Sequence, residues 1–134
     1  CIIDSEGLIE CDIIKSKSGA DIIYTLIKCE EEPSGASYLL RVQYKKKNEY
    51  IEVDALTKEE GMTGIRDATI FESFMREKGD SKNIFDGWSE DPYDKNFKKG
   101  FLMNKSEARE YDEMFPNHPL SEIRRLLSFI ADNN

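Results

Sequence analysis

Residues 111–130 read YDEMFPNHPLSEIRRLLSFI, and two prolines divide this stretch into two helical patterns. Pro116 disfavours a helical conformation in the residue before it, so a first helix should end there. Asn117 can cap the second helix, and Pro119 is tolerated in its first turn. The sequence therefore predicts a corner around His118, the only histidine of the chain.

Beyond this corner, apolar residues recur at steps of three and four, the spacing of one face of a helix. The stripe consists of Leu120, Ile123, Leu126, Leu127 and Ile130. We expect this helix to dock on the hydrophobic core.

The N-terminal half has the composition and period of β-strands. Apolar or alternating runs, rich in β-branched residues, are separated by turn signals at 17–19, 30–35 and 45–48. The runs cover residues 9–15, 21–29, 38–45 and 50–56. Because consecutive strands with short connections pair antiparallel, the sequence predicts a four-stranded meander.

Helical spacing begins again at Thr63 and continues to Gly79, which favours a helix that packs across one side of the sheet. Asn104 and Glu107 have the spacing of a capping box and predict a short helix through Met114. We therefore expect an α+β fold, with the antiparallel meander covered by about three C-terminal helices. A single domain should span residues 1–134, strand-rich over 8–57 and helical or irregular over 62–134.

The charge balance is acidic. Asp and Glu total 27 against 19 Lys and Arg, a formal net charge of -8. Such a field repels nucleic-acid backbones and anionic lipid headgroups, and it suits a protein partner with a basic rim or a cationic ligand better. An acidic surface that only keeps the protein soluble is the alternative. No apolar run approaches the roughly 20 residues that span a bilayer.

Sequence motifs for catalysis or cofactor binding are missing. The chain contains no nucleophile elbow, no phosphate-binding loop and no dinucleotide fingerprint, and a lone histidine makes a weak catalytic set. Carboxylates and an amide between 86 and 96 could attract calcium, but their spacing fits no EF-hand, and zinc lacks a ligand pair at short spacing. We therefore expect a protein that is not an enzyme and that holds no metal or cofactor. A small hydrolase is the less favoured alternative.

The longest stretch without a period runs from Asp80 to Met103 and is rich in aromatic and acidic residues. Its central segment is turn-forming, a context in which large amphipathic rings can be exposed as binding anchors. The candidate partner-binding residues are Trp88, Glu90, Asp91, Tyr93 and Asp94.

Three cysteines bear on the compartment. The sequence starts at Cys1, followed by two isoleucines, which is the pattern of a mature bacterial lipoprotein with a lipid attached to that cysteine. The alternative is that Cys1 is only the residue at which the given sequence begins. Cys11 and Cys29 would then form an even pair, and a disulfide between them suits an oxidising compartment. Two buried reduced thiols are the alternative, because a turn at 17–19 places Cys11 opposite residue 25 or 26.

In outline the chain resembles small periplasmic lipoproteins, among them the immunity proteins with which bacteria neutralise effectors delivered by type VI and similar secretion systems. The resemblance rests on the start Cys1-Ile2-Ile3, the size and the acidity. It implies a periplasmic location with a lipid anchor in the outer membrane, and a non-catalytic inhibitor that covers a toxin's active site. A structural lipoprotein of the cell envelope and a cytoplasmic domain of another role are the alternatives.

Overall fold

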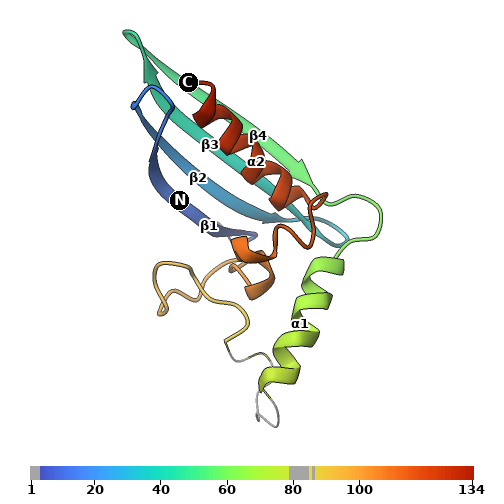
Figure 1. Ribbon diagram of the computed structural model, residues 1–134. Helices are drawn as coiled ribbons and strands as arrows, with labels where there is room; N and C mark the ends of the chain where they lie inside the picture. The colour runs from blue at the N-terminus through green and yellow to red at the C-terminus, as the bar shows by residue number, and fades with distance from the viewer. Residues whose placement is uncertain (1–3, 79–84, 86) are drawn as a thin grey trace.

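Four antiparallel strands form the sheet of this protein, and the computed structural model describes residues 4–78, 85 and 87–134. The strands follow each other in space in chain order, so the predicted meander is confirmed (Figure 1). Their bounds are β1, Glu6–Lys15; β2, Asp21–Glu30; β3, Ala36–Lys46; and β4, Glu49–Lys58. Adjacent strands are joined by short turns, of which the tightest is the two-residue connection between β3 and β4.

The register of the first hairpin separates its two cysteines. Cys11 lies opposite Thr25, as the turn position predicted, and Cys29 lies opposite Glu6. Four residues of strand, about 13 Å, therefore lie between the two positions, which is too far for a disulfide. Both thiols are free, so the disulfide is not formed in this fold.

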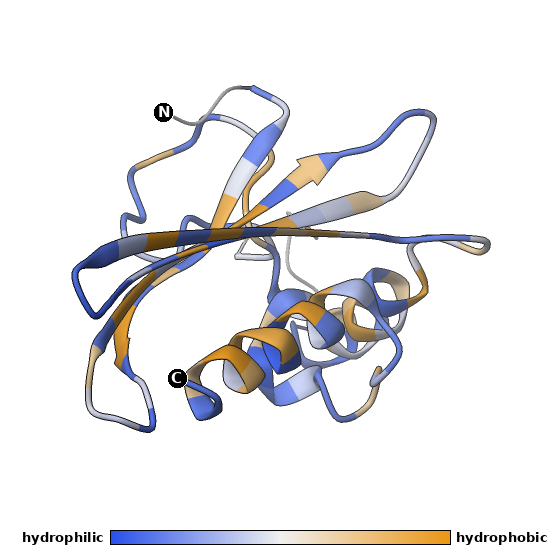
Figure 2. Cartoon of the chain, turned by 90° about the horizontal axis from the view of Figure 1, so that it is seen from above, coloured by the Kyte–Doolittle hydropathy of each residue, from blue (hydrophilic) through white to orange (hydrophobic). Residues whose placement is uncertain are grey.

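Helix α2 (Pro119–Asp132) covers one face of the sheet and packs on β3 and β4. Leu120, Ile123 and Leu127 on its apolar stripe are buried in the core, as the periodicity predicted. Figure 2 shows this apolar side of α2 turned toward the sheet. Burial of each such side chain contributes roughly 1.5–3 kcal/mol to the free energy of unfolding. The packing of α2 on the sheet is therefore a large part of what stabilises this face.

The start of α2 differs from the predicted cap in one residue. His118, rather than Asn117, is the N-cap, and its Nδ1 accepts a hydrogen bond from the backbone N–H of Leu120 at 3.1 Å. Pro119 occupies the first turn as expected. The ring of His118 also meets the ring of Tyr38 edge to face, with centroids 5.7 Å apart. The side chain thus has the packing and hydrogen-bonding role that its place at a corner suggests.

Helix α1 (Ile65–Lys78) occupies the range predicted from its period, but it does not lie across the sheet. It extends away from the end of the sheet (Figure 1), and its main contact among the elements is with the short helix Lys105–Glu107. Its only fully buried side chains are Arg66 and Ile70, because its aromatic residues pack against the long loop instead of the strands. The expectation that α1 covers one side of the sheet is therefore wrong.

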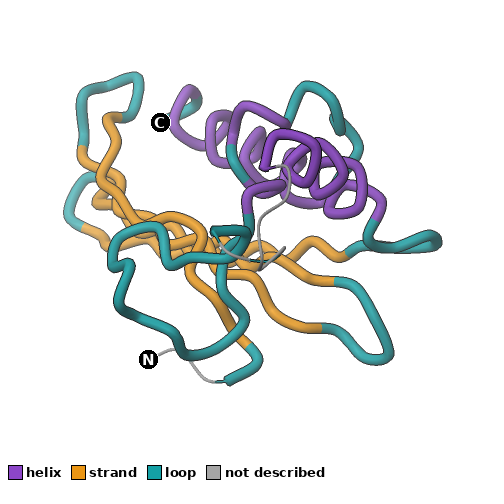
Figure 3. Tube along the Cα trace, turned by 90° about the horizontal axis from the view of Figure 1, so that it is seen from below, coloured by secondary structure: helices purple, strands orange, loops and turns teal. Residues whose placement is uncertain are grey.

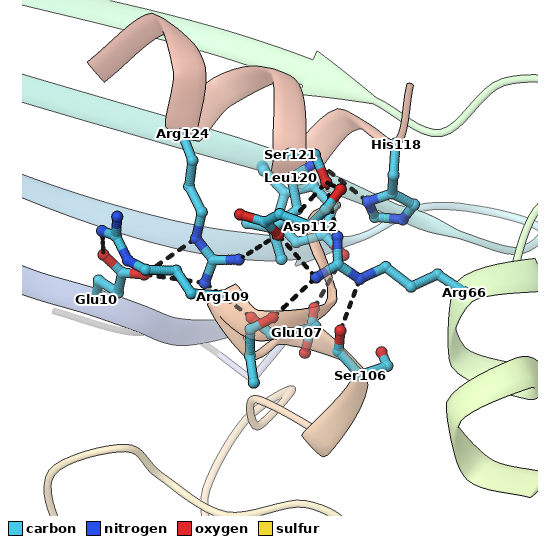
Figure 4. Close-up of polar contacts among 12 residues, drawn as sticks. Glu10, Arg66, Ser106, Glu107, Arg109, Asp112, His118, Leu120, Ser121 and Arg124 are labelled. Atoms are coloured by element: carbon cyan, nitrogen blue, oxygen red, sulfur yellow. Dashed lines mark hydrogen bonds and ion pairs between the residues drawn. The ribbon is translucent and has the colours of Figure 1, made fainter. Parts of the chain in front are cut away.

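The third predicted helix is replaced by two 3₁₀ turns, Lys105–Glu107 and Arg109–Tyr111. The capping box of Asn104 and Glu107 is present, but the helix ends after one turn. Arginine side chains donate hydrogen bonds to backbone carbonyl oxygens that, in an α-helix, would accept from N–H groups of the same helix. Arg66 donates to Ser106 and Ala108 at 2.6 and 3.1 Å, and Arg124 donates to Glu107 at 2.8 Å (Figure 4). Tertiary hydrogen bonds thus stop the helix that the local sequence favours.

These turns are fixed by a buried ionic cluster between the sheet and the helices. Lys28 and Glu107 form an ion pair of 2.8 Å, and Glu107 also accepts from the Tyr38 hydroxyl at 2.9 Å and from the backbone N–H of Asn104 at 2.8 Å. A second group joins Arg66 and Arg124 to Asp112, each at 2.9 Å, and Arg124 to Glu10. Among the described residues, no buried side-chain polar atom lacks a partner. The cluster is a satisfied structural network rather than a reactive site.

Candidate functional site

One face of the sheet carries no helix in the described part of the chain. Figure 3 shows both helices on the same side of the strands. On the other side, which we call the open face, the register aligns side chains in rows across all four strands. One row is apolar and consists of Leu8, Ile27, Leu39 and Leu56; the next is polar and consists of Cys11, Thr25, Arg41 and Asp54.

Exposed apolar side chains gather on this open face. The part of the chain that the structure describes exposes ten large apolar side chains. Four of them lie on the open face: Ile13 is 59% exposed, Ile23 47%, Tyr50 86% and Leu56 65%. Ile13 and Ile23 pair in the register, and Leu56 lies beyond the polar row. Because a sheet usually buries its apolar side chains, this face is a candidate for contact with another molecule.

A shallow hollow of about 510 Å³ lies at the β3–β4 hairpin end of the open face. Its walls combine apolar side chains with acidic groups and one lysine, whose Nζ stands 5.8 Å from the centre of the Tyr50 ring. The lining residues are Asp21, Ile23, Gln43, Tyr44, Lys45, Tyr50, Ile51 and Glu52. The hollow could receive one large side chain of a partner.

The open face carries charges of both signs, and its acidic groups gather around Arg41. Arg41 binds Asp54 through two nitrogens, at 3.0 and 2.9 Å, and Glu52 at 3.3 Å. The hydrogen bond from Arg41 lowers the pKa of the Asp54 carboxyl, so that group remains charged well into the acidic range. Two carboxylates therefore surround one guanidinium at this point, whereas Lys15, Lys45 and Lys58 lie elsewhere on the same face.

The segment 90–94 forms a turn at the edge of the open face, beside β1. Asp91 holds the turn, because its Oδ2 accepts hydrogen bonds from the backbone N–H groups of Tyr93 at 3.0 Å and Asp94 at 2.8 Å. The Tyr93 hydroxyl accepts from the N–H of Cys11 at 2.9 Å and donates to its carbonyl at 3.0 Å. The ring of Tyr93 is nevertheless 61% exposed, so a fixed aromatic surface adjoins the open face.

The five residues predicted as a binding site have different environments. Tyr93 and Asp94 are exposed and Glu90 is partly exposed, whereas Asp91 is buried and organises the turn. Trp88 is partly exposed, and its ring packs on Phe71 and Phe74 of α1, with centroids 4.9 and 5.5 Å away. Trp88 therefore fastens the long loop to α1. The predicted lipid attachment at Cys1 lies outside the described residues.

Sequence reasoning missed the open-face residues Ile13, Ile23, Tyr50 and Leu56 as candidates. A usable signal exists, since Ile22-Ile23 and Ala55-Leu56 place apolar residues on both faces of a strand. A strand with one solvated face normally alternates apolar and polar residues. Two adjacent apolar residues in such a strand therefore indicate apolar side chains on the face of the sheet that points away from the core.

The only histidine, His118, takes part in structural contacts. The Nε2 atom of His118 stands 3.6 Å from a Glu59 carboxylate oxygen, but Nδ1 of the same ring is used by the helix cap. Glu59 itself accepts from the backbone N–H groups of Ala36 and Gly64, both at 3.0 Å, and so fastens a loop. No group of three or more His, Cys, Asp or Glu side chains in the described ranges could hold a metal ion.

The described helices include none that is long and apolar enough to cross a membrane. The sequence matches no protein-family model, and neither a curated protein nor a solved structure matches it.

Proposed function

We propose that this protein is a non-catalytic immunity or inhibitor protein, which neutralises a secreted bacterial toxin by covering its active site. Its contact surface is the open face together with Tyr93 and Asp94 on the adjoining turn. The partner is a protein with a basic rim.

The observation that carries this proposal is the concentration of exposed apolar side chains on a sheet face that no helix covers. Ile13, Ile23, Tyr50 and Leu56 lie there, with Tyr93 at the edge. An inhibitor that works by occlusion needs a broad and rigid surface, and a four-stranded sheet backed by α2 supplies one. An aromatic side chain held in place beforehand loses little entropy on binding, which favours Tyr93, fixed by its two hydrogen bonds to Cys11, as an anchor.

The charge of the protein supports the same kind of partner. Toxins that act on nucleic acids or on anionic envelope components carry basic residues around their clefts, and a protein of net charge -8 is attracted to such rims. Around Arg41 the carboxylates of Asp54 and Glu52 outnumber the guanidinium. These groups steer the encounter, while the apolar side chains supply desolvated contact.

The test begins with affinity capture from the source bacterium grown with its secretion systems active. We expect one stoichiometric toxin-like protein, whose activity the purified protein abolishes in vitro. Ile23→Asp should then weaken the complex by more than about tenfold, equivalent to about 1.4 kcal/mol. Phe129→Asp is the matched control, because Phe129 is similarly exposed but lies on α2, away from the open face.

Two results would contradict the proposal. A capture experiment that retains no stoichiometric partner favours the alternative, a structural lipoprotein of the cell envelope. A captured toxin whose affinity falls equally with Ile23→Asp and Phe129→Asp means that the open face is not its contact surface.

A further inference from the structure

The two edge strands of the sheet, β1 and β4, differ in whether other segments of the chain bond to their outward backbone groups. At the β1 edge, the Tyr93 hydroxyl uses both the N–H and the carbonyl of Cys11, and Phe101 donates its backbone N–H to the carbonyl of Glu6 at 2.8 Å. The chain thus covers part of the backbone groups that an edge strand leaves unpaired, at Glu6 and Cys11. At the β4 edge, no described segment does the same.

The unpaired groups of β4 can be identified from its register. Glu59 donates its N–H to the carbonyl of Ala36 at 3.0 Å, in line with the register of β3 and β4. In an antiparallel pair, inward and outward backbone groups alternate along each strand. The odd-numbered residues of β4 therefore bond to β3, while Glu52, Asp54 and Leu56 direct their N–H and carbonyl groups outward. No hydrogen bond in the described part of the chain reaches these outward groups.

The side chains of β4 set the chemistry of this edge. Glu52 and Asp54 point to the open face and are exposed, whereas Ile51, Val53 and Ala55 are half-buried on the side of α2. A strand added here would place alternate side chains next to Glu52 and Asp54, where basic groups are attracted and acidic groups repelled. Its other side chains would lie beside Ile51, Val53 and Ala55, where apolar groups fit.

A second copy of this chain does not suit the edge. Two copies of β4 can pair antiparallel only with outward residues opposite outward residues. Two registers meet this condition with the longest overlap. In one, Glu52 of each copy lies opposite Asp54 of the other; in the second, Asp54 lies opposite Asp54. Like charges directly opposite each other are destabilising, so the edge repels itself while remaining free for a basic strand.

We propose that β4 receives an extended strand of the partner protein, with Lys or Arg at alternate positions, as a fifth strand of the sheet. The proposal rests on the proposed function in so far as the partner is the toxin. Backbone hydrogen bonds to Glu52, Asp54 and Leu56 give this strand its affinity, and the two carboxylates select its charge.

The first test uses a synthetic peptide of about ten residues, the length of a long strand, in which Lys and Arg alternate with Val and Thr. A peptide of the same composition with its basic residues in one block is the control. We expect the alternating peptide to bind at least about tenfold more tightly. Amide hydrogen exchange at Glu52, Asp54 and Leu56 should slow on binding. Absence of binding, or binding that leaves these three amides unprotected, overturns the proposal.

A pair of variants separates backbone pairing from simple charge attraction. Asp54→Asn removes the charge and keeps the outward N–H, whereas Asp54→Pro removes both and leaves the bonds to β3 intact. Thermal unfolding checks that both variants fold. We expect Asp54→Pro to bind the alternating peptide at least about tenfold more weakly than Asp54→Asn. Equal binding by the two variants means that only charge acts, and the added strand is then rejected.

The same variants distinguish this inference from the proposed function. If Ile23→Asp weakens toxin binding while Asp54→Asn and Asp54→Pro bind the toxin equally, the open face is the contact surface and the added strand is wrong. If no toxin partner exists but the alternating peptide pairs with β4, the added strand stands and the toxin assignment fails.

Discussion

The Tyr93 hydroxyl bridges the N–H and the carbonyl of Cys11, at 2.9 and 3.0 Å, and so occupies a position where another strand could otherwise pair with β1. One side chain thereby ties the 90–94 turn to the edge of the sheet. Because its ring remains exposed, the same residue both protects an edge and presents a surface.

Tyr93→Phe removes these two hydrogen bonds and keeps the ring. We expect a loss of about 1 kcal/mol in the free energy of unfolding, since a hydrogen bond of this kind contributes roughly 0.5–1.5 kcal/mol net. Amide exchange at Cys11 should accelerate. Tyr50→Phe is the control, because the Tyr50 ring is 86% exposed and should change neither quantity. Unchanged exchange at Cys11 in Tyr93→Phe would mean that the hydroxyl does not hold this edge in solution.

Trp88 should behave as a packing residue. Its ring lies against Phe71 and Phe74, so Trp88→Ala removes aromatic contacts between the long loop and α1. For a partly exposed ring we expect a loss of about 2–3 kcal/mol, below the range for fully buried aromatic residues. Trp88→Phe should lose less. If chemical denaturation instead shows unchanged stability and partner binding falls, Trp88 is a binding anchor after all.

The buried pair of Lys28 and Glu107 gives a stronger prediction. Both side chains are almost fully buried, and Lys28 also stands 3.9 Å from the centre of the Phe101 ring. Glu107→Gln leaves the ammonium group without its countercharge and should cost about 3–5 kcal/mol in urea unfolding. Adding Lys28→Met removes the ammonium group that is buried without a countercharge, so the double variant should be more stable than Glu107→Gln alone. A double variant that is less stable than Glu107→Gln would show that the ammonium is satisfied by other groups.

Glu10 should contribute to stability in a pH-dependent manner. Burial by itself raises the pKa of this carboxyl, but hydrogen bonds from Arg109 and Tyr24 and the charge of Arg124 outweigh it and lower the pKa below its ordinary value of 4.5. Because the folded state has the lower pKa, the contribution is fully present above pH 4.5 and is lost as the pH falls through the folded pKa. Urea unfolding from pH 7 to pH 2.5 should show this loss.

Glu10→Gln is the variant that isolates the effect. It should be less stable than the wild type at pH 7, with a gap that narrows below pH 4.5. Glu52→Gln is the comparison: it removes an exposed carboxylate that pairs with Arg41, and it should lower the stability at pH 7 much less than Glu10→Gln does. A gap between wild type and Glu10→Gln that stays constant down to pH 2.5 would contradict the assignment.

Sequence patterns predicted the strands, turns and helices that depend on residues close together in the chain. The alternation in β3 and β4, the turn at 17–19 and the stripe from Leu120 to Ile130 each correspond to an observed strand, turn or helix. The capping box at Asn104 is also present, although it begins a 3₁₀ turn rather than an α-helix. The predicted binding residues agree with the structure less well, because Trp88 and Asp91 have internal partners.

The sequence by itself determined the four-stranded meander, the range of α1 and the proline corner that starts α2, because hydrophobic period, turn residues and caps act over a few positions. Only the tertiary structure decided which face of the sheet is covered, where α1 lies, and that Lys28, Arg66, Arg124 and Glu107 are buried. Those outcomes depend on contacts between residues far apart in the chain. Glu107 meets Lys28 across 79 positions, and Arg66 meets the carbonyl of Ser106 across 40. The hydrophobic period of a segment carries no information about such pairings. In the sequence, Arg66 therefore cannot be told from an exposed arginine, although it bonds to a carbonyl at the end of a distant helical turn.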